Sequence, residues 1–215
     1  MRGLPSSSFF VACSGGPDSM AVLHFLSQAH KGKTSVIHIN HKTPFADRAQ
    51  ALVQDHCQKN NIPFLAQDIT ASLPKGASKE EFWRNERYKI FHSLPNPVLT
   101  GHHLNDVVET WIFSSLHGKG KIIPYQNQNV LRPFLLSKRE RLLSYCQKKS
   151  VPFILDPSNT DTSFMRNFIR CELLPKALVV NPGIEKVMAK KVEQMYEDLS
   201  LSSKNVPGIA HSSRP

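Results

Sequence analysis

The sequence predicts an α/β protein with a doubly wound, five-stranded parallel sheet and a small C-terminal helical extension. Up to about residue 150, short apolar runs alternate with helical patterns of roughly 10–15 residues. Such alternation is typical of parallel strands joined by right-handed crossover helices. Two glycines directly follow the first apolar run, as in a sharp strand-to-helix turn. The 215 residues, 40% of them apolar, suffice for one sizeable core.

Each strand is expected as a short apolar run bounded by turn residues. These runs are residues 8–13, 35–40, 63–69, 97–101 and 130–132. Helical spacing of apolar side chains, with capping boxes opening at Ser78 and Ser137, predicts the intervening helices. They cover residues 17–30, 47–60, 78–91, 104–116 and 137–149.

Beyond residue 150 the alternation ends, which predicts three parts. Residues 1–150 form the α/β domain, residues 151–200 a helical extension, and residues 201–215 a disordered tail rich in Ser and Pro. Within the extension, one helix is expected at 162–174, ended by Pro175, and another at 183–200. The second is amphipathic and needs an apolar partner surface, on its own domain or on a second subunit, so a homodimer is possible.

Charge and cysteine content narrow the class of protein. The net charge is +10, from 27 Lys and Arg against 17 acids, and the excess is spread along the chain. A charge of this size favours a polyanionic partner such as RNA. Apolar stretches are too short for a membrane span, and the N-terminus lacks the apolar core of a signal peptide, so a cytoplasmic location is expected. The four cysteines are far apart, which favours reduced thiols over a disulfide framework or zinc site.

The segment Ser14-Gly15-Gly16-Pro17-Asp18-Ser19 predicts an anion site, most plausibly for phosphate. The glycines allow a sharp turn and close approach of a ligand to the backbone. Amides of the following first helical turn are free to donate, with the positive end of the helix dipole behind them. Pro17 suits that turn because it has no amide to leave unpaired.

A second set of polar residues follows the fourth strand. Asp106 and Glu109 are three apart and share a helix face. Beside a phosphate loop, such a pair suits Mg²⁺ held jointly with phosphate oxygens, although acids in a first helical turn are also common caps. His38 and His41 lie at the end of the second strand, where a histidine is usually structural.

Two groups of arginines are candidates for anion contacts. Arg84 and Arg87 lie on one helix and could clamp a phosphate or a carboxylate, or else pair with Glu80 or Glu81. Arg166 and Arg170 are four apart, so they share a face that suits RNA phosphates or simply remains solvated.

Taken together, these segments resemble the tRNA(Ile)-lysidine synthase family of PP-loop enzymes, whose fold is Rossmann-like. The similarity runs from about Val11 to Pro175. The matching segments are residues 14–19, the histidine motif 38–41, the Arg-x-x-Arg-Tyr helix 83–88, the helix motif 101–110, the glycine turn 117–120, the Arg-Pro-Phe segment 132–134 and residues 156–170. The last segment is the most specific, because other PP-loop families do not share it.

The resemblance implies a ligase that converts the wobble cytidine of an isoleucine tRNA to lysidine, with ATP, Mg²⁺ and free L-lysine. ATP would adenylate the cytidine with release of pyrophosphate, and the lysine amine would then expel AMP. By this resemblance, ATP is bound by Ser14, Gly15, Gly16, Pro17, Asp18, Ser19 and His38. The catalytic residues are Asp18, Asp106, Glu109, Arg84 and Arg87. The metal is held by Asp106 and Glu109, and tRNA is contacted by Arg166, Asn167 and Arg170.

The sequence departs from the family at three positions and after its last helix. Asn105 stands where the family has an acid, Lys42 where it has a glycine, and Leu155 where it has another acid. Most family members continue into a C-terminal domain that discriminates tRNAs. Alternative predictions are another PP-loop RNA modifier such as a thiolase, which the lack of paired cysteines disfavours, an amide-forming ligase, or an inactive, truncated tRNA-binding protein.

Overall fold

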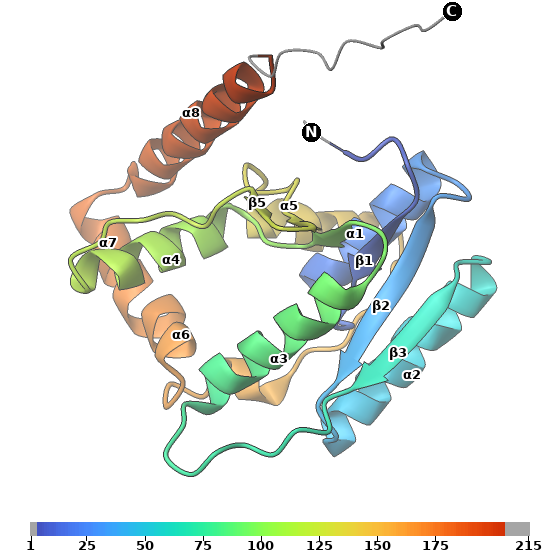
Figure 1. The fold of residues 1–215 in the computed structure, drawn as a ribbon. Helices are drawn as coiled ribbons and strands as arrows, with labels where there is room; N and C mark the ends of the chain where they lie inside the picture. Colours follow the sequence, from blue (N-terminus) through green and yellow to red (C-terminus); the bar gives the residue numbers. More distant parts are fainter. Residues whose placement is uncertain (1–3, 205–215) are drawn as a thin grey trace, which may run out of the picture.

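Six strands form a single sheet in the order β3-β2-β1-β4-β6-β5 (Figure 1). The computed structural model describes residues 4–204. Neighbouring strands are parallel except for the edge hairpin of β5 with β6. The strands are β1 (Phe9–Ala12), β2 (Thr34–Asn40), β3 (Phe64–Asp68), β4 (Val98–Thr100), β5 (Gln126–Asn127) and β6 (Val130–Leu131).

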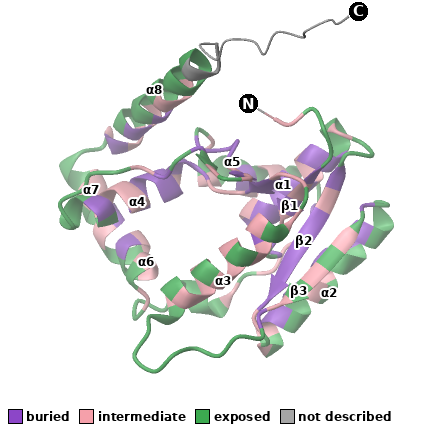
Figure 2. Cartoon of the chain, in the orientation of Figure 1, coloured by how far each residue is buried: buried purple, intermediate pink, exposed green. Residues whose placement is uncertain are grey.

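Helices cover both faces of this sheet, because side chains on successive strand residues point to opposite sides. Phe9 and Val11 pack with α1 (Pro17–Ala29), α2 (Pro44–Lys59) and α5 (Arg139–Lys148). Phe10 and Ala12 pack instead toward α3 (Lys79–Ser93) on the opposite face. The central strand β2 is buried along almost its whole length (Figure 2). The doubly wound α/β class is therefore confirmed.

The C-terminal segment builds a second apolar cluster on α4 (Leu104–Leu116). The elements of this C-terminal segment are a 3₁₀ turn η1 (Pro157–Thr160), α6 (Met165–Phe168), a π-helical turn η2 (Ile169–Leu173), α7 (Leu174–Val180) and α8 (Ile184–Lys204). Ile184, Met188 and Val192 of α8 pack against Val107 and Val108 of α4. The predicted amphipathic helix thus finds its partner surface within its own chain.

The structure corrects three expectations about the elements. The sheet has a sixth strand, β5, which two residues are too few to reveal by pattern. The helix expected at 162–174 begins at Met165, contains a π-helical turn, and continues past Pro175 to Val180, because that proline lies in the first turn of α7 and needs no amide partner. Helix α8 extends to Lys204, four residues into the expected tail, of which 205–215 lie outside the described residues.

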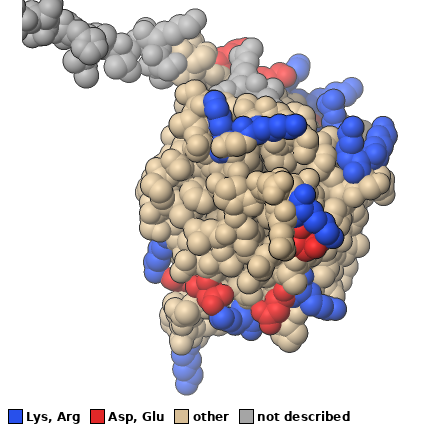
Figure 3. All heavy atoms as spheres, turned by 90° about the vertical axis from the view of Figure 1, so that its right-hand side faces the viewer, with Lys and Arg blue, Asp and Glu red and all other residues tan. Residues whose placement is uncertain are grey.

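On the face that Figure 3 shows, the basic side chains do not gather into one continuous patch. There, Lys and Arg side chains are scattered, with Asp and Glu between them. Within residues 4–204, no helix is long and apolar enough to cross a membrane. The arginines that gather most closely lie inside the cleft described below.

Candidate functional site

The carboxyl ends of β1, β2 and β4 open into a cavity of about 590 Å³. In a doubly wound sheet, ligands bind at this edge, where the order of the strands reverses. Here the strand order reverses between β1 and β4. From β1 the chain continues to β2 on one side, and β4 lies on the other side of β1. The cavity also reaches α3 and the C-terminal segment, so it is lined from five parts of the chain.

Residues 14–19 form the tight turn between β1 and α1. Gly15 has a φ of +84°, and a Cβ there would lie 3.3 Å from the Cβ of Ala49, so the turn requires glycine. The Ser14 amide donates to the Ser19 hydroxyl at 3.1 Å, and that hydroxyl donates to the Gly16 carbonyl at 3.0 Å. The turn is thereby rigid before any ligand arrives, with the start of α1 facing the cavity.

His38 supports this turn from the neighbouring strand. Its Nδ1 lies 2.8 Å from the carbonyl oxygen of Cys13, and because a carbonyl oxygen only accepts, Nδ1 carries the hydrogen. Burial lowers the pKa of His38, so the ring is neutral. Its Nε2 is buried and has no partner in the described part of the chain. His38 therefore lines the cavity and also holds the backbone at the base of the loop.

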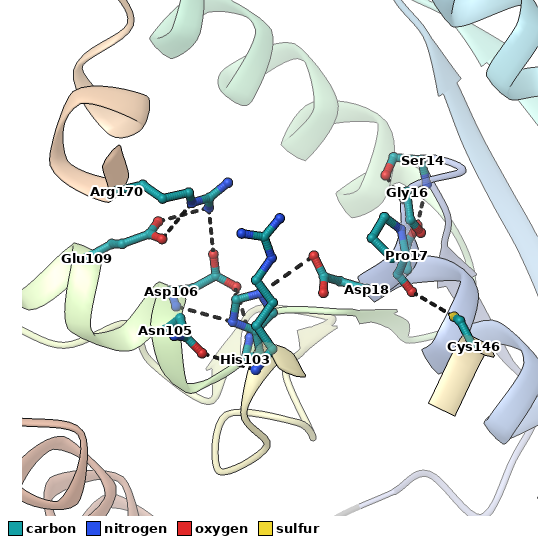
Figure 4. Close-up of polar contacts among 12 residues, drawn as sticks. Ser14, Gly16, Pro17, Asp18, His103, Asn105, Asp106, Glu109, Cys146 and Arg170 are labelled. Atoms are coloured by element: carbon teal, nitrogen blue, oxygen red, sulfur yellow. Dashed lines mark hydrogen bonds and ion pairs between the residues drawn. The ribbon is translucent and has the colours of Figure 1, made fainter. Parts of the chain in front are cut away.

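His103, at the N-cap of α4, lies between two carboxylates. Its Nε2 is 3.6 Å from Asp18 Oδ2, and its Nδ1 is 3.4 Å from Asp106 Oδ2 (Figure 4). Burial alone would lower the pKa of His103, but the hydrogen bond to Asp18 and the charge of Asp106 outweigh it and raise that pKa. The other oxygen of Asp18, Oδ1, is buried and has no partner among the described residues.

Glu109 forms a buried ion pair with the C-terminal segment. Its side chain is 2% exposed, and Arg170 donates to both of its oxygens, at 2.7 and 3.0 Å (Figure 4). Arg170 also approaches Asp106 at 3.5 Å, and Arg166 lies 3.8 Å from Glu109. These pairs attach the segment after residue 160 to α4 and close one side of the cavity.

Arg84 and Arg87 reach the cavity from α3. Within residues 4–204 neither lies within ion-pair distance of a carboxylate, so the expected alternative pairing with Glu80 or Glu81 is not formed. Burial lowers the pKa of Arg87, and the charge of Arg166 adds to this effect. Arg84 instead lies over the ring of Tyr88, 5.0 Å from its centroid. Both guanidinium groups are thus available to an anionic ligand.

The structure brings most of the predicted site residues into one cavity. Those lining it are Ser14, Gly16, Asp18, Ser19, His38, Arg84, Arg87, Asp106, Arg166 and Arg170. Gly15, Pro17, Glu109 and Asn167 do not line it. The Asn167 side chain donates to the carbonyls of Ser158 and Asp161, so it shapes a loop next to the cavity.

Sequence reasoning assigned no role to His103, Lys79 or Trp83, and it gave His41 little weight. A signal existed for His103: it precedes a helix and has an acid three residues later, the spacing of a reciprocal cap, which the structure contains. Asn105, at the position of a family acid, bonds the Arg139 amide at 3.1 Å and Glu185 at 3.4 Å. It therefore lies among structural contacts outside the cavity lining.

The family resemblance implies Mg²⁺, and the candidate ligands for this ion are Asp18, Asp106 and Glu109. Mg²⁺ prefers oxygen ligands and often takes one or two carboxylates plus substrate phosphates. Asp18 has a free buried oxygen and Asp106 lines the cavity, whereas Arg170 occupies both oxygens of Glu109. No group of three or more His, Cys, Asp or Glu in the described residues forms a metal cluster. The geometry thus favours Asp18 over Glu109 as the partner of Asp106.

Comparison with known proteins supports the class that the fold and cavity indicate. A family model described as the PP-loop domain matches residues 2–177. The chain belongs to the PP-loop family, and its similarity within that family is to tRNA(Ile)-lysidine synthases.

Two such relatives illustrate the similarity. The enzyme of Pseudomonas putida is 32% identical over 95% of this chain and 54% of its own length. That of Coxiella burnetii is 34% identical over 79% of this chain and 41% of its own length. The chain therefore spans about half the length of these curated relatives or less.

A solved structure confirms the fold. The U34-tRNA thiolase NcsA from Methanococcus maripaludis superposes with a TM-score of 0.71, covering 98% of this chain and 80% of that chain. At 14% sequence identity this likeness concerns the fold alone.

Proposed function

We propose that the protein is a tRNA-modifying, ATP-dependent carbon–nitrogen ligase that converts the wobble cytidine of an isoleucine tRNA to lysidine. The observation that carries the proposal is the combination of a hydrogen-bonded phosphate loop at residues 14–19 with a cavity whose Arg84 and Arg87 have no carboxylate partner within residues 4–204. Relatives named tRNA(Ile)-lysidine synthase, which match most of this chain, supply the particular reaction.

In the first step, the O2 oxygen of cytidine attacks the α-phosphorus of ATP, the bond to the β-phosphate oxygen breaks, and pyrophosphate leaves. The loop amides at the start of α1 face the phosphates, where negative charge develops on the leaving group. Arg84 and Arg87, which reach the same cavity from α3, neutralise the same charge. Mg²⁺, held by Asp18 and Asp106 with phosphate oxygens, would supply further charge neutralisation when bound.

In the second step, the ε-amine of L-lysine attacks C2 of the activated cytidine, and AMP leaves with the former O2 oxygen. The amine must be neutral to attack, so it gives up a proton first. Asp18 and Asp106 face the cavity near His103 and are the carboxylates placed to orient the ammonium group and accept that proton. Arg166 and Arg170, on the rim formed by the C-terminal segment, are proposed to meet the tRNA backbone.

The alternatives find less support in the site. A thiolase that relies on paired reactive cysteines is disfavoured, because Cys13, Cys57 and Cys146 are buried and only Cys171 is exposed among the four. Burial raises the pKa of Cys13 and of Cys146 to about 11. An inactive tRNA-binding protein would not need a free Asp18 oxygen beside a rigid phosphate loop. A cytoplasmic location and a homodimer remain predictions from the sequence.

The proposal is tested with the purified chain, ATP, L-lysine and a transcript of the isoleucine tRNA. AMP release is expected only when lysine and RNA are both present. Asp18→Ala should lower AMP formation at least about 100-fold, because it removes a group that acts on the reacting phosphates, while tRNA affinity stays within about twofold. Asp55→Asn, on an exposed face of α2, is the matched control.

Wild-type turnover in the Asp18→Ala variant would remove the loop carboxylate from the mechanism. RNA binding by the unsubstituted chain with no AMP release under any condition would favour the inactive tRNA-binding protein instead.

A further inference from the structure

Two aromatic rings meet in the wall of the same cavity. Trp83 of α3 and His41, just after β2, have ring centroids 4.8 Å apart and planes inclined by 37°. Both side chains line the cavity that also contains Ser14 and Ser19. Burial lowers the pKa of His41 to about 4, and the charge of Arg87 adds to this effect, so the imidazole is neutral near pH 7. The pair presents two uncharged aromatic rings within a cavity whose lining has more basic than acidic side chains.

One polar atom of this surface lacks a partner. His41 Nδ1 is buried and accepts or donates no hydrogen bond in the part of the chain that the structure describes. Buried polar atoms are normally paired, so this nitrogen is suited to a partner from outside the protein. A purely structural ring stack would not require an unpaired nitrogen in the cavity wall.

The contacts around Trp83 indicate what that partner is. The Lys79 ammonium lies over the indole, 4.6 Å from the centroid, and Lys79 is exposed to solvent. An exposed ammonium on an indole is a weaker contact than a nucleobase stacked on the same ring, so a base can displace it. Arg84 and Arg87 follow on the same helix, and their guanidinium groups, which pair with no carboxylate in the described part of the chain, are offered to the phosphate of that nucleotide.

We propose that Trp83 and His41 form a stacking site for the nucleobase of a bound nucleotide, from which the base displaces the Lys79 ammonium. This inference rests on the proposed function, because both of its nucleotide substrates, ATP and the RNA, carry such bases. The shared chemistry is a heteroaromatic ring linked to a phosphate.

Tryptophan fluorescence tests the site directly. The chain contains two tryptophans, so Trp111→Phe leaves Trp83 as the single emitter. Trp111 packs on the α4 cluster away from the cavity lining, which makes this variant a suitable background. Three ligands are then titrated: ATP, tripolyphosphate, and an anticodon stem-loop RNA that has no 5′-triphosphate. Emission from Trp83 is expected to change with ATP or with the RNA and to remain constant with tripolyphosphate, and the ligand that responds identifies the source of the base.

Affinity provides a second readout. In the same background, Trp83→Leu should weaken the responding ligand about tenfold, since one stacked base is lost. Trp83→Phe should restore most of that affinity, and tripolyphosphate should bind all three proteins equally.

Calorimetry separates the failure of the stacking site from the failure of the proposed function. Constant Trp83 emission with ATP and RNA that calorimetry shows to be bound would overturn the stacking site alone. No heat from either ligand would overturn the proposed function and this site with it.

Discussion

Glu109 is a charged side chain whose position depends on residues far away in the sequence. It is 2% exposed, and Arg170, 61 residues later, donates to both of its oxygens. A buried charge is tolerated only when it is paired and hydrogen-bonded. Arg170 therefore has a structural task in addition to any contact with RNA, and the two tasks can be separated by experiment.

Replacing Glu109 tests the structural task. Glu109→Gln should lower the free energy of unfolding by about 2 kcal/mol, because it removes the closer of the two carboxylates paired with the partly buried Arg170 guanidinium. Urea denaturation followed by circular dichroism measures this. The exposed pair of Lys59 with Asp55 is the control, and Asp55→Asn should change stability by less than about 0.5 kcal/mol. Equal effects of the two substitutions would contradict the structural task.

At the residue scale, sequence reasoning identified Asp18 and Asp106 and the arginines but not their partners. The spacing of Asp106 and Glu109 predicted that they share a helix face, and both lie on α4. It could not reveal that Arg170 would occupy Glu109 and leave Asp106 at the cavity. Which acid meets which base depends on distances across the fold, and local spacing carries no information about them.

At the element scale, the turn between β1 and α1 depends on one backbone conformation. Gly15 has a φ of +84°, and its surroundings are tight, with Ala49 and Ile154 close to the space that a Cβ would fill. Gly32 has a similar φ of +74° but open space around it. The two glycines therefore share the conformational requirement and differ in packing.

This difference predicts unequal effects of the same substitution. Gly32→Ala should cost about 1 kcal/mol, the price of a left-handed conformation for a residue with a Cβ. Gly15→Ala should cost at least about 1 kcal/mol more, because Ala49 has to move, and it should also weaken ATP binding measured by calorimetry. Thermal unfolding gives the stability changes. Equal losses at the two positions would show that the packing around Gly15 has no influence.

The crossover helices and five of the six strands followed their patterns, whereas the helix type in the C-terminal segment did not. Helix α1 begins at Pro17, as the glycine turn and the helical spacing predict. The sequence predicts a helix at 162–174 that ends at Pro175, whereas the structure continues from α6 through η2 into α7 and ends at Val180. Its π-helical turn contains Arg170, whose bond to Glu109 is a long-range contact. A periodic pattern cannot anticipate a change of helix type at such a contact.

At the scale of the whole molecule, the histidines predict how stability depends on pH. Burial lowers the pKa of His24, His38, His41, His56 and His102, the last to about 3. The unfolded chain takes up protons near pH 6.5 at these positions, but the folded chain does not. Their stabilisation is present above pH 6.5 and is lost as the pH falls toward their folded pKa values.

His103 and Asp106 also change how the free energy of unfolding depends on pH. The pKa of His103 is raised, so its contribution has the opposite direction. Burial would raise the pKa of Asp106, but the charges of His103 and His102 and of Arg166 outweigh it and lower that pKa. A lowered carboxyl pKa gives stability that is lost only as the pH falls below the unfolded value, which is 3.8 for Asp106. Between pH 6.5 and pH 4.5, five histidines with lowered pKa values therefore oppose one histidine with a raised pKa.

The free energy of unfolding should therefore fall steadily between pH 6.5 and pH 4.5. Each proton that only the unfolded chain binds adds about 1.4 kcal/mol per pH unit to the slope. His56→Phe, outside the cavity lining, should make the slope shallower because it removes one such group. Urea denaturation over a series of pH values measures both slopes. A stability that is constant from pH 6.5 to 4.5 would contradict this prediction.

The sequence by itself determined the alternating α/β class, the glycine turn after the first strand and the residues with the chemistry of a nucleotide site. These features depend on neighbours within a few residues, because helical spacing, strand runs and tight turns are local properties of the chain. Only the tertiary structure decided the strand order, the pairing of Glu109 with Arg170 and the meeting of His41 with Trp83. Each of these joins segments that are distant along the chain, and their contact depends on how the whole core packs.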